Sequence, residues 1–87
     1  MALYKLILSK QVRKKDLPNI PQKDRAKVVN AITNLQDNPR PPKATRLTNR
    51  EEYRVRQGDY RILYTIEDEI CIVEVRNVGH RREVYKN

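Results

Sequence analysis

Three strand-like runs joined by short turns constrain the fold of this chain more than any other feature. They span residues 53–57, 60–66 and 70–78, and apolar or aromatic side chains alternate with polar ones over much of their length. Gly58-Asp59 joins the first two runs, and residues 67–69 join the last two. Because connections this short link neighbouring antiparallel strands, the pattern predicts a three-stranded antiparallel meander.

The first half of the chain predicts one further strand and two helices. Residues 3–8 carry apolar side chains on both faces, which favours a central, well-covered strand rather than an edge strand. Ser9 is a suitable N-cap for a short helix that runs to residue 15 or 16 and turns Val12 inward. A second helix begins at Pro21 and ends near Asn38. Its apolar stripe consists of Val28, Val29, Ile32 and Leu35.

A proline-rich loop over residues 37–45 separates the second helix from the meander, since prolines at 39, 41 and 42 exclude regular structure. With 87 residues, the chain has room for one modest core. The order of elements is a strand, two helices and three strands. This order predicts an α+β fold in a single domain, residues 1–87, with both helices packed on one face of a four-stranded sheet.

The charge of the chain favours a polyanionic partner. Its formal net charge is +8 and its sequence pI is about 9.9, values typical of nucleic-acid-binding domains. The charges are also unevenly placed, because no acid precedes Asp16 and five of the later acids gather at 51–52 and 67–69. This uneven distribution favours a nucleic-acid-binding role over a role of the charge in solubility alone.

Several classes of site are excluded by the motifs that the sequence lacks. It has no glycine-rich phosphate loop, no paired histidine and carboxylate cluster for a metal, and no Gly-x-Ser-x-Gly. We therefore expect neither a metal nor a cofactor. The single cysteine, Cys71, lies inside an apolar run and is expected to be a buried small hydrophobe. The N-terminal apolar run is too short for a signal peptide or membrane span, which predicts a cytoplasmic protein without a membrane partner.

Arginine carries the candidate chemistry of the strands. Successive side chains of a strand point to opposite faces, so Arg54 and Arg56 share one face, and Arg61 faces away from Tyr60 and Ile62. RNA cleaves when its 2′-hydroxyl attacks the neighbouring phosphate in line. An enzyme then has to position the strand, stabilise charge on the phosphorane and transfer protons. The guanidinium group suits the second task because it stays charged and matches phosphate oxygens.

The C-terminal tail adds the remaining candidates for proton transfer and RNA binding. His80 is the one side chain whose unperturbed pKa lies near neutrality, and Tyr85 could stack on a base or take part in proton transfer. The remaining candidate RNA-binding cations in the tail and the middle loop are Arg82, Lys86, Arg40, Lys43 and Arg46.

These residues closely resemble the RelE branch of the RelE/ParE toxins. The resemblance rests on Tyr53-Arg54-Val55-Arg56, on Gly58, on Tyr60-Arg61-Ile62-Leu63-Tyr64 and on Val78-Gly79-His80-Arg81-Arg82-Glu83-Val84-Tyr85. It extends over nearly the whole chain. The resemblance implies the toxin of a type II toxin–antitoxin system, a ribosome-dependent mRNA interferase that cuts the codon in the A site and stops translation. It also implies a RelE-like fold and silencing by a cognate antitoxin in a hetero-oligomer.

The resemblance assigns roles to individual residues. Arg61 matches the arginine that stabilises the phosphate transition state, Arg81 the arginine that acts at the leaving group, and Tyr85 the tyrosine that orients or stacks on the substrate. Arg54 and Arg56 stand where relatives have lysines. Arginine is a poor base because its pKa exceeds about 12. The resemblance therefore does not identify the general base. His80 is the side chain whose intrinsic pKa suits this role best.

Two other functions remain possible from the sequence. A ParE-like toxin would inhibit DNA gyrase and cleave nothing, although that branch typically lacks the constellation of Arg61, Arg81 and Tyr85. A non-catalytic RNA- or ribosome-binding module would use its arginines only to hold phosphates.

Overall fold

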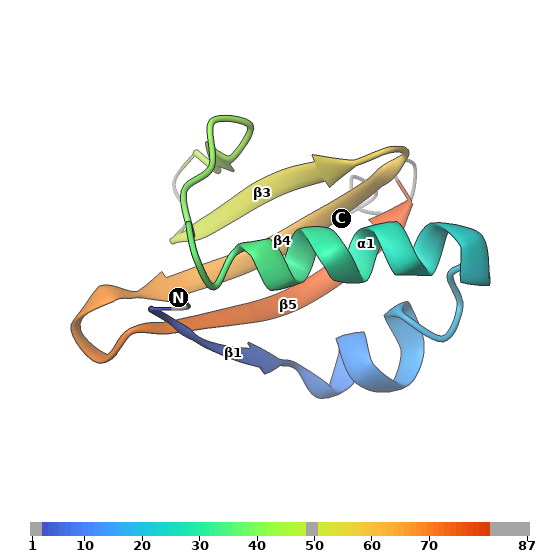
Figure 1. Cartoon of the computed structure of the whole chain (residues 1–87), viewed down its shortest axis with the longest axis horizontal. Helices are drawn as coiled ribbons and strands as arrows, with labels where there is room; N and C mark the ends of the chain where they lie inside the picture. The colour runs from blue at the N-terminus through green and yellow to red at the C-terminus, as the bar shows by residue number, and fades with distance from the viewer. Residues whose placement is uncertain (1–2, 49–50, 81–87) are drawn as a thin grey trace.

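The computed structural model describes residues 3–48 and 51–80, and it shows a five-stranded sheet with a long helix across one face (Figure 1). The strands lie in the order β1-β5-β4-β3-β2. Their bounds are β1 Lys5–Leu8, β2 Thr45–Arg46, β3 Glu52–Gln57, β4 Tyr60–Glu67 and β5 Ile72–His80. The helical elements are η1 Val12–Asp16, α1 Gln22–Asn34 and η2 Asp68–Ile70. The predicted α+β class and the antiparallel meander β3-β4-β5 are confirmed.

The sheet has one strand more than the sequence predicts. Thr45 and Arg46 at the end of the proline-rich loop pair antiparallel with Arg54 and Tyr53, and so form the edge strand β2. A two-residue strand is too short to show an alternation of apolar and polar side chains. The expectation of four strands is therefore wrong, for a reason that no sequence pattern could reveal.

Strand β1 lies at the edge of the sheet, so the expectation of a central strand is also wrong. It pairs in parallel with β5, and the side of β1 away from β5 faces no described strand. Leu6 and Leu8 pack against the core, but Ile7 on the other face is 37 % exposed. Apolar side chains on both faces of this strand therefore did not predict burial of both faces. The segments that pack against a strand come from distant parts of the chain, which the local pattern does not reveal.

The first helical segment begins directly after Ser9, as the sequence predicts, because residues 10 and 11 are already helical ahead of η1. The Val12 backbone N–H donates a hydrogen bond of 3.2 Å to the Ser9 hydroxyl, which confirms Ser9 as the cap. The helix has a π-type turn, since the Leu17 N–H donates to the Val12 carbonyl five residues earlier at 2.9 Å. Val12 is fully buried, as expected.

Helix α1 is shorter than predicted. It ends at Asn34, and the next residues close it with tighter bonds, from the N–H of Leu35 to the carbonyl of Ile32 at 3.0 Å. Val28, Ile32 and Leu35 are buried as the stripe predicts, whereas Val29 is 41 % exposed and lies outside the stripe. Within residues 3–48 and 51–80, the helices are too short or too polar to span a membrane.

The two faces of the sheet differ sharply. One face, here called the core face, packs against α1 and η1 (Figure 1). Its buried strand residues are Val55, Ile62, Tyr64, Val73, Val75 and Val78. The other face, here called the open face, carries Arg54, Arg56 and Arg61, and no described helix covers it. Alternation along β3 and β4 therefore separates the core from the arginines, as the sequence indicates.

The two turns of the meander use left-handed backbone. Gly58 between β3 and β4 has a φ of 61°, a conformation that glycine adopts without steric cost. After β4, η2 is followed by its C-cap Cys71, which has a φ of 51° and is exposed. The expectation that Cys71 is buried within a strand is therefore wrong, because the chain is still turning at this residue.

Strand β5 contains a β-bulge. Leu63 of β4 pairs with Asn77 while Tyr64 pairs with Val75, so Arg76 is the extra residue. The bulge shifts the alternation by one position, and Val78 therefore joins Val75 in the core. Without it, the core face would have received Asn77 instead.

Candidate functional site

Arg56 and Arg61 lie at one end of the open face, next to the β3–β4 turn at Gly58. They are directly opposite each other in the register of β3 and β4, and Arg54 lies two residues along β3 on the same face. Val55 and Ile62, which alternate with them, are 7 % and 0 % exposed on the core face. The sequence shows only which face of its own strand each arginine occupies. The pairing of β3 with β4 brings the three arginines to one region of the sheet.

Arg61 is the most enclosed of the three arginines. Its side chain is 5 % exposed, and its cross-strand neighbours are Arg56 on β3 and Gly79 on β5. A guanidinium group stays charged in such a place. Charge interactions are also stronger where water is excluded, so Arg61 would act more strongly on a nearby anion than an exposed arginine.

His80 lies on the opposite side of the sheet from Arg61. It pairs with Tyr60, and the two rings meet edge to face with their centroids 5.7 Å apart. Both residues line a hollow of about 530 Å³ together with Asp16 at the end of η1 and Asn19 in the turn that follows. The structure therefore does not bring together His80 and the arginine cluster.

At the other end of the open face, Arg76 lies close to the carboxylates of Glu52 and Glu74. The bulge residue Arg76 lies 3.5 Å from Glu74 and 4.0 Å from Glu52, which belongs to β3 two strands away. Glu52 and Glu74 are both paired with Thr65 in the register of the sheet, which places them on the face of Arg54. The open face thus has a cationic end at Arg56 and Arg61 and a mixed end at Arg76.

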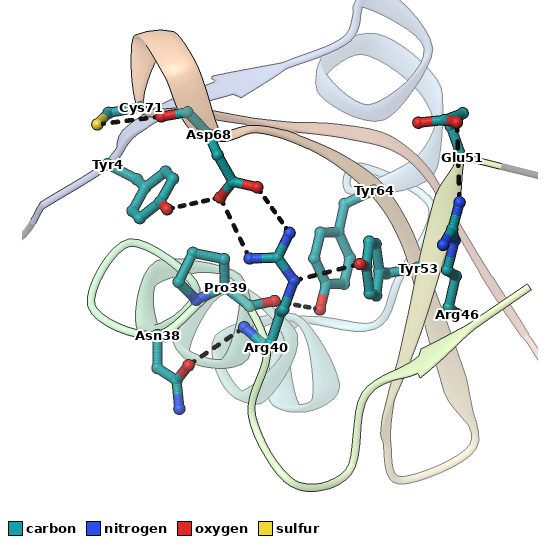
Figure 2. A network of polar contacts seen from close by, with 10 residues as sticks. All are labelled: Tyr4, Asn38, Pro39, Arg40, Arg46, Glu51, Tyr53, Tyr64, Asp68 and Cys71. Atoms are coloured by element: carbon teal, nitrogen blue, oxygen red, sulfur yellow. Dashed lines mark hydrogen bonds and ion pairs between the residues drawn. The ribbon is translucent and has the colours of Figure 1, made fainter.

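Arg40, predicted as an RNA-binding residue, takes part in an intramolecular network that Figure 2 shows. Its guanidinium donates two hydrogen bonds to the Asp68 carboxylate, of 2.8 and 3.2 Å, and one of 3.2 Å to the Tyr53 hydroxyl. It also lies 5.4 Å from the centre of the Tyr53 ring. The Tyr4 hydroxyl donates to the same carboxylate at 2.8 Å. Arg40 therefore ties the proline-rich loop to the β4–β5 turn.

The neighbouring groups respond to this network. The hydrogen bonds from Arg40 and then Tyr4 lower the pKa of Asp68, and the bond to Asp68 raises the pKa of Tyr4. The buried Tyr64 hydroxyl donates a 2.6 Å hydrogen bond to the carbonyl of Pro39, next to Arg40. Burial raises the pKa of Tyr64 to about 12, so its hydroxyl remains a donor at neutral pH.

The other predicted cations divide between exposed positions and undescribed ones. Arg46 is exposed and lies 3.7 Å from Glu51, and exposed Lys43 lines a hollow beside β3 with Arg56. Four predicted site residues lie outside the described residues: Arg81, Arg82, Tyr85 and Lys86. Among the residues that the structure describes, no group of three histidine, cysteine, aspartate or glutamate side chains could hold a metal ion.

Two residues near the site were missed in the sequence. The Asp16 carboxylate accepts a hydrogen bond of 2.8 Å from the Val78 N–H at the end of β5, and another of 2.9 Å from Gln11. Arg76 lies within the predicted strand 70–78 and now proves to be the bulge residue of β5. The sequence did not indicate either residue, because the position of Arg76 depends on the bulge and the role of Asp16 depends on the contact between η1 and β5.

Comparison with known proteins gives a consistent family. A family model described as the ParE toxin of type II toxin–antitoxin systems, parDE, matches residues 6–85. A curated protein of Methanocaldococcus jannaschii, whose name RelE1 places it among toxins, is 34 % identical over 77 residues. That match covers 84 % of this chain and 86 % of the relative.

Solved structures agree with the fold. A chain of the toxin–antitoxin complex RelBE2 from Mycobacterium tuberculosis superposes with a TM-score of 0.77 at 30 % identity, covering 90 % of this chain and 98 % of that one. The isolated RelE toxin of E. coli has a TM-score of 0.76 at 23 % identity and covers 94 % of this chain and 90 % of its own. At that identity the second match speaks for the fold alone.

Proposed function

The chain belongs to the RelE/ParE superfamily of type II toxins, and from this membership we propose that it is a ribosome-dependent endoribonuclease. It would enter the ribosomal A site in the cytoplasm, cut the mRNA codon there and so inhibit translation. The observation that carries the proposal is the pairing of Arg56 with Arg61 on an open sheet face beside Arg54. Such a cluster of fixed cations matches the charge that builds up on a phosphate during cleavage.

The chemistry of the proposal is attack of the 2′-hydroxyl on the adjacent phosphate. The bond from phosphorus to the 5′-oxygen breaks, leaving a cyclic phosphate and a 5′-hydroxyl. Arg61 would stabilise the negative charge on the phosphorane, and Arg54 and Arg56 would hold the flanking phosphates. Because Arg61 is only 5 % exposed, the complex with RNA has to expose more of this guanidinium than the structure does.

The remaining roles are proposals for residues at the C-terminal end. Arg81 would act at the leaving oxygen, Tyr85 would stack on or orient the substrate, and Arg82 and Lys86 would add charge. His80 lies on the core face, which argues against it as the base for a reaction beside Arg61. We therefore propose that positioning and charge stabilisation contribute most of the rate enhancement, with the ribosome completing the alignment.

A cognate antitoxin is the second expected partner. The relatives of known structure include toxin–antitoxin complexes, and a chain of net charge +8 suits a partner segment with acidic and apolar residues. The two proteins would form a hetero-oligomer, and the association rate would fall with rising salt. An association rate that stays constant from low to high salt contradicts this electrostatic contribution.

The decisive experiment for the proposed function is primer extension on cellular mRNA after the protein is induced without its antitoxin. Cuts within codons are expected, only in translated regions, and absent in an Arg61→Ala strain. Purified protein should cut an mRNA efficiently only when that mRNA is bound to ribosomes. Equal cleavage of naked RNA with and without ribosomes would refute ribosome dependence.

One observation favours a second candidate function. The matching family model is described by ParE rather than RelE, and a ParE-like toxin would act on DNA gyrase. The same induced cells distinguish the two. Trapped gyrase–DNA complexes with intact mRNA would support the ParE-like activity, whereas cut mRNA without such complexes would support the endoribonuclease.

A further inference from the structure

The bulge in β5 gives Arg76 a position that regular strand geometry would not. Val73, Val75 and Val78 reach the core, and the bulge between Val75 and Asn77 leaves Arg76 as the residue without a cross-strand partner. Bulges of this kind redirect a side chain and occur often beside active sites. Here the redirected side chain is a cation, with 53 % of its surface exposed.

The bulge is held in place from the first helix. Ser9 accounts for two of the contacts, because its N–H donates to the Val75 carbonyl at 2.9 Å and its hydroxyl to the Arg76 carbonyl at 3.0 Å. On the far side, Asp16 accepts from the Val78 N–H at 2.8 Å. The backbone around Arg76 is thus fixed while its side chain is exposed, as a preorganised contact residue requires.

The partners of Arg76 are weak and easily exchanged. Its guanidinium lies 4.0 Å from the Glu52 carboxylate and 3.5 Å from the Glu74 carboxylate, distances longer than those of close, charge-assisted hydrogen bonds. Exposed ion pairs of this kind contribute little to stability, because water and salt screen them. A phosphate, whose two non-bridging oxygens can accept a bidentate pair of hydrogen bonds, would compete well for the same guanidinium.

We propose that Arg76 is a phosphate-contact residue of the open face, held by Glu52 and Glu74 until an RNA phosphate displaces them. This inference rests on the proposed function, since it takes the open face as the RNA surface. Glu52 lies two residues from Arg54 on the same strand and face, so Arg76 extends the line of cations from Arg56 and Arg54 toward β5. The two carboxylates limit binding to polyanions that contact the whole line.

The test is a binding measurement on ribosomes carrying an mRNA with a 2′-O-methyl group at the scissile nucleotide, which blocks cleavage. Affinity is measured between 50 and 200 mM salt for each variant. Arg76→Ala should lower affinity about three- to tenfold, and it should reduce the slope of log affinity against log salt by about 0.7, the value for one phosphate of a single strand. Arg76→Lys should keep the slope. Lys27→Ala, on exposed α1 surface, is the charge-matched control and should change neither quantity.

A double-mutant cycle isolates the exchange itself. Replacing both acids, Glu52→Gln with Glu74→Gln, should raise affinity more when Arg76 is present than in the Arg76→Ala background. Equal gains in both backgrounds would mean that the acids act only through long-range repulsion, and the proposal would be wrong. Arg56→Ala is measured in parallel. If it weakens binding while Arg76→Ala does not, only the inference on Arg76 fails; if neither weakens binding, the open face is not the RNA surface and both proposals fail.

Discussion

Arg56 on β3 and Arg61 on β4 lie directly opposite each other, on the sheet face that carries no described helix. Like charges in such cross-strand positions disfavour the sheet. We propose that this arrangement is kept because an anion can be held between the two guanidinium groups. The relationship is the observation behind our proposal that the open face binds RNA.

The first prediction concerns catalysis by Arg61. Arg61→Ala should lower the single-turnover cleavage rate about 100- to 1,000-fold, because losing one preorganised contact to a developing oxyanion costs about 3–4 kcal/mol. Arg61→Lys should recover little, since an ammonium group lacks the planar fork. The measurement is the rate at saturating ribosome complex, with affinity determined separately. Weak binding together with a wild-type saturated rate would make Arg61 a docking residue.

Arg56→Gln should separate binding from stability. The substitution removes one of two facing charges, so the free energy of unfolding should stay equal or rise by up to about 0.5 kcal/mol. Affinity for programmed ribosomes should nevertheless fall. Denaturant unfolding and ribosome binding of the same preparation check both signs, and a loss of stability with unchanged affinity would contradict the assignment of Arg56.

Arg40→Ala and Lys43→Ala are a matched pair of loop substitutions. Arg40 holds Asp68 and Tyr53, so its loss should lower the melting temperature clearly. Lys43 is exposed and should leave the melting temperature within about 2 °C, while weakening ribosome binding. Thermal unfolding and binding of both variants provide the check. Equal melting temperatures would show that the Arg40 network does not stabilise the fold.

Acid stability should depend on Asp68. Hydrogen bonds from Arg40 and Tyr4 lower its pKa in the folded state, so its contribution is present above the unfolded value near 4 and is lost as pH falls through the folded value. The wild-type protein should therefore lose unfolding free energy below about pH 4 more steeply than Asp68→Asn. Urea unfolding at a series of acidic pH values tests this, and parallel curves would contradict it.

Tyr64→Phe should destabilise the protein by about 1–3 kcal/mol, because the Pro39 carbonyl would lose its buried donor. The raised pKa of Tyr64, about 12, adds a signature at high pH. Between the pKa of the unfolded state, near 10, and the higher pKa of the folded state, Tyr64 is ionised only when the protein is unfolded. Ionisation therefore stabilises the unfolded state over this pH range, and the free energy of unfolding falls. The phenylalanine variant should lack this part of the alkaline decline.

Local patterns in the sequence determined a large part of this protein. The alternation in β3 and β4 separated Val55 and Ile62 from the arginines, and the short turns made the strands antiparallel neighbours. Ser9 was identifiable as a helix cap because capping is a contact between residues three apart. The net positive charge could also be determined without the structure, because it follows from the composition. These features depend on residues close in the chain, where side-chain direction follows directly from backbone geometry.

The tertiary structure decided how those local pieces combine. The register of β3 against β4 placed Arg56 opposite Arg61, and the bulge at Arg76 turned His80 to the core face. The contact of Arg40 with Asp68 joins residues 28 positions apart, and it places a cation that the sequence predicts to bind RNA within an internal network. Pairing across such distances depends on the whole set of competing contacts rather than on local propensity, and so these relationships could be seen only in the folded chain.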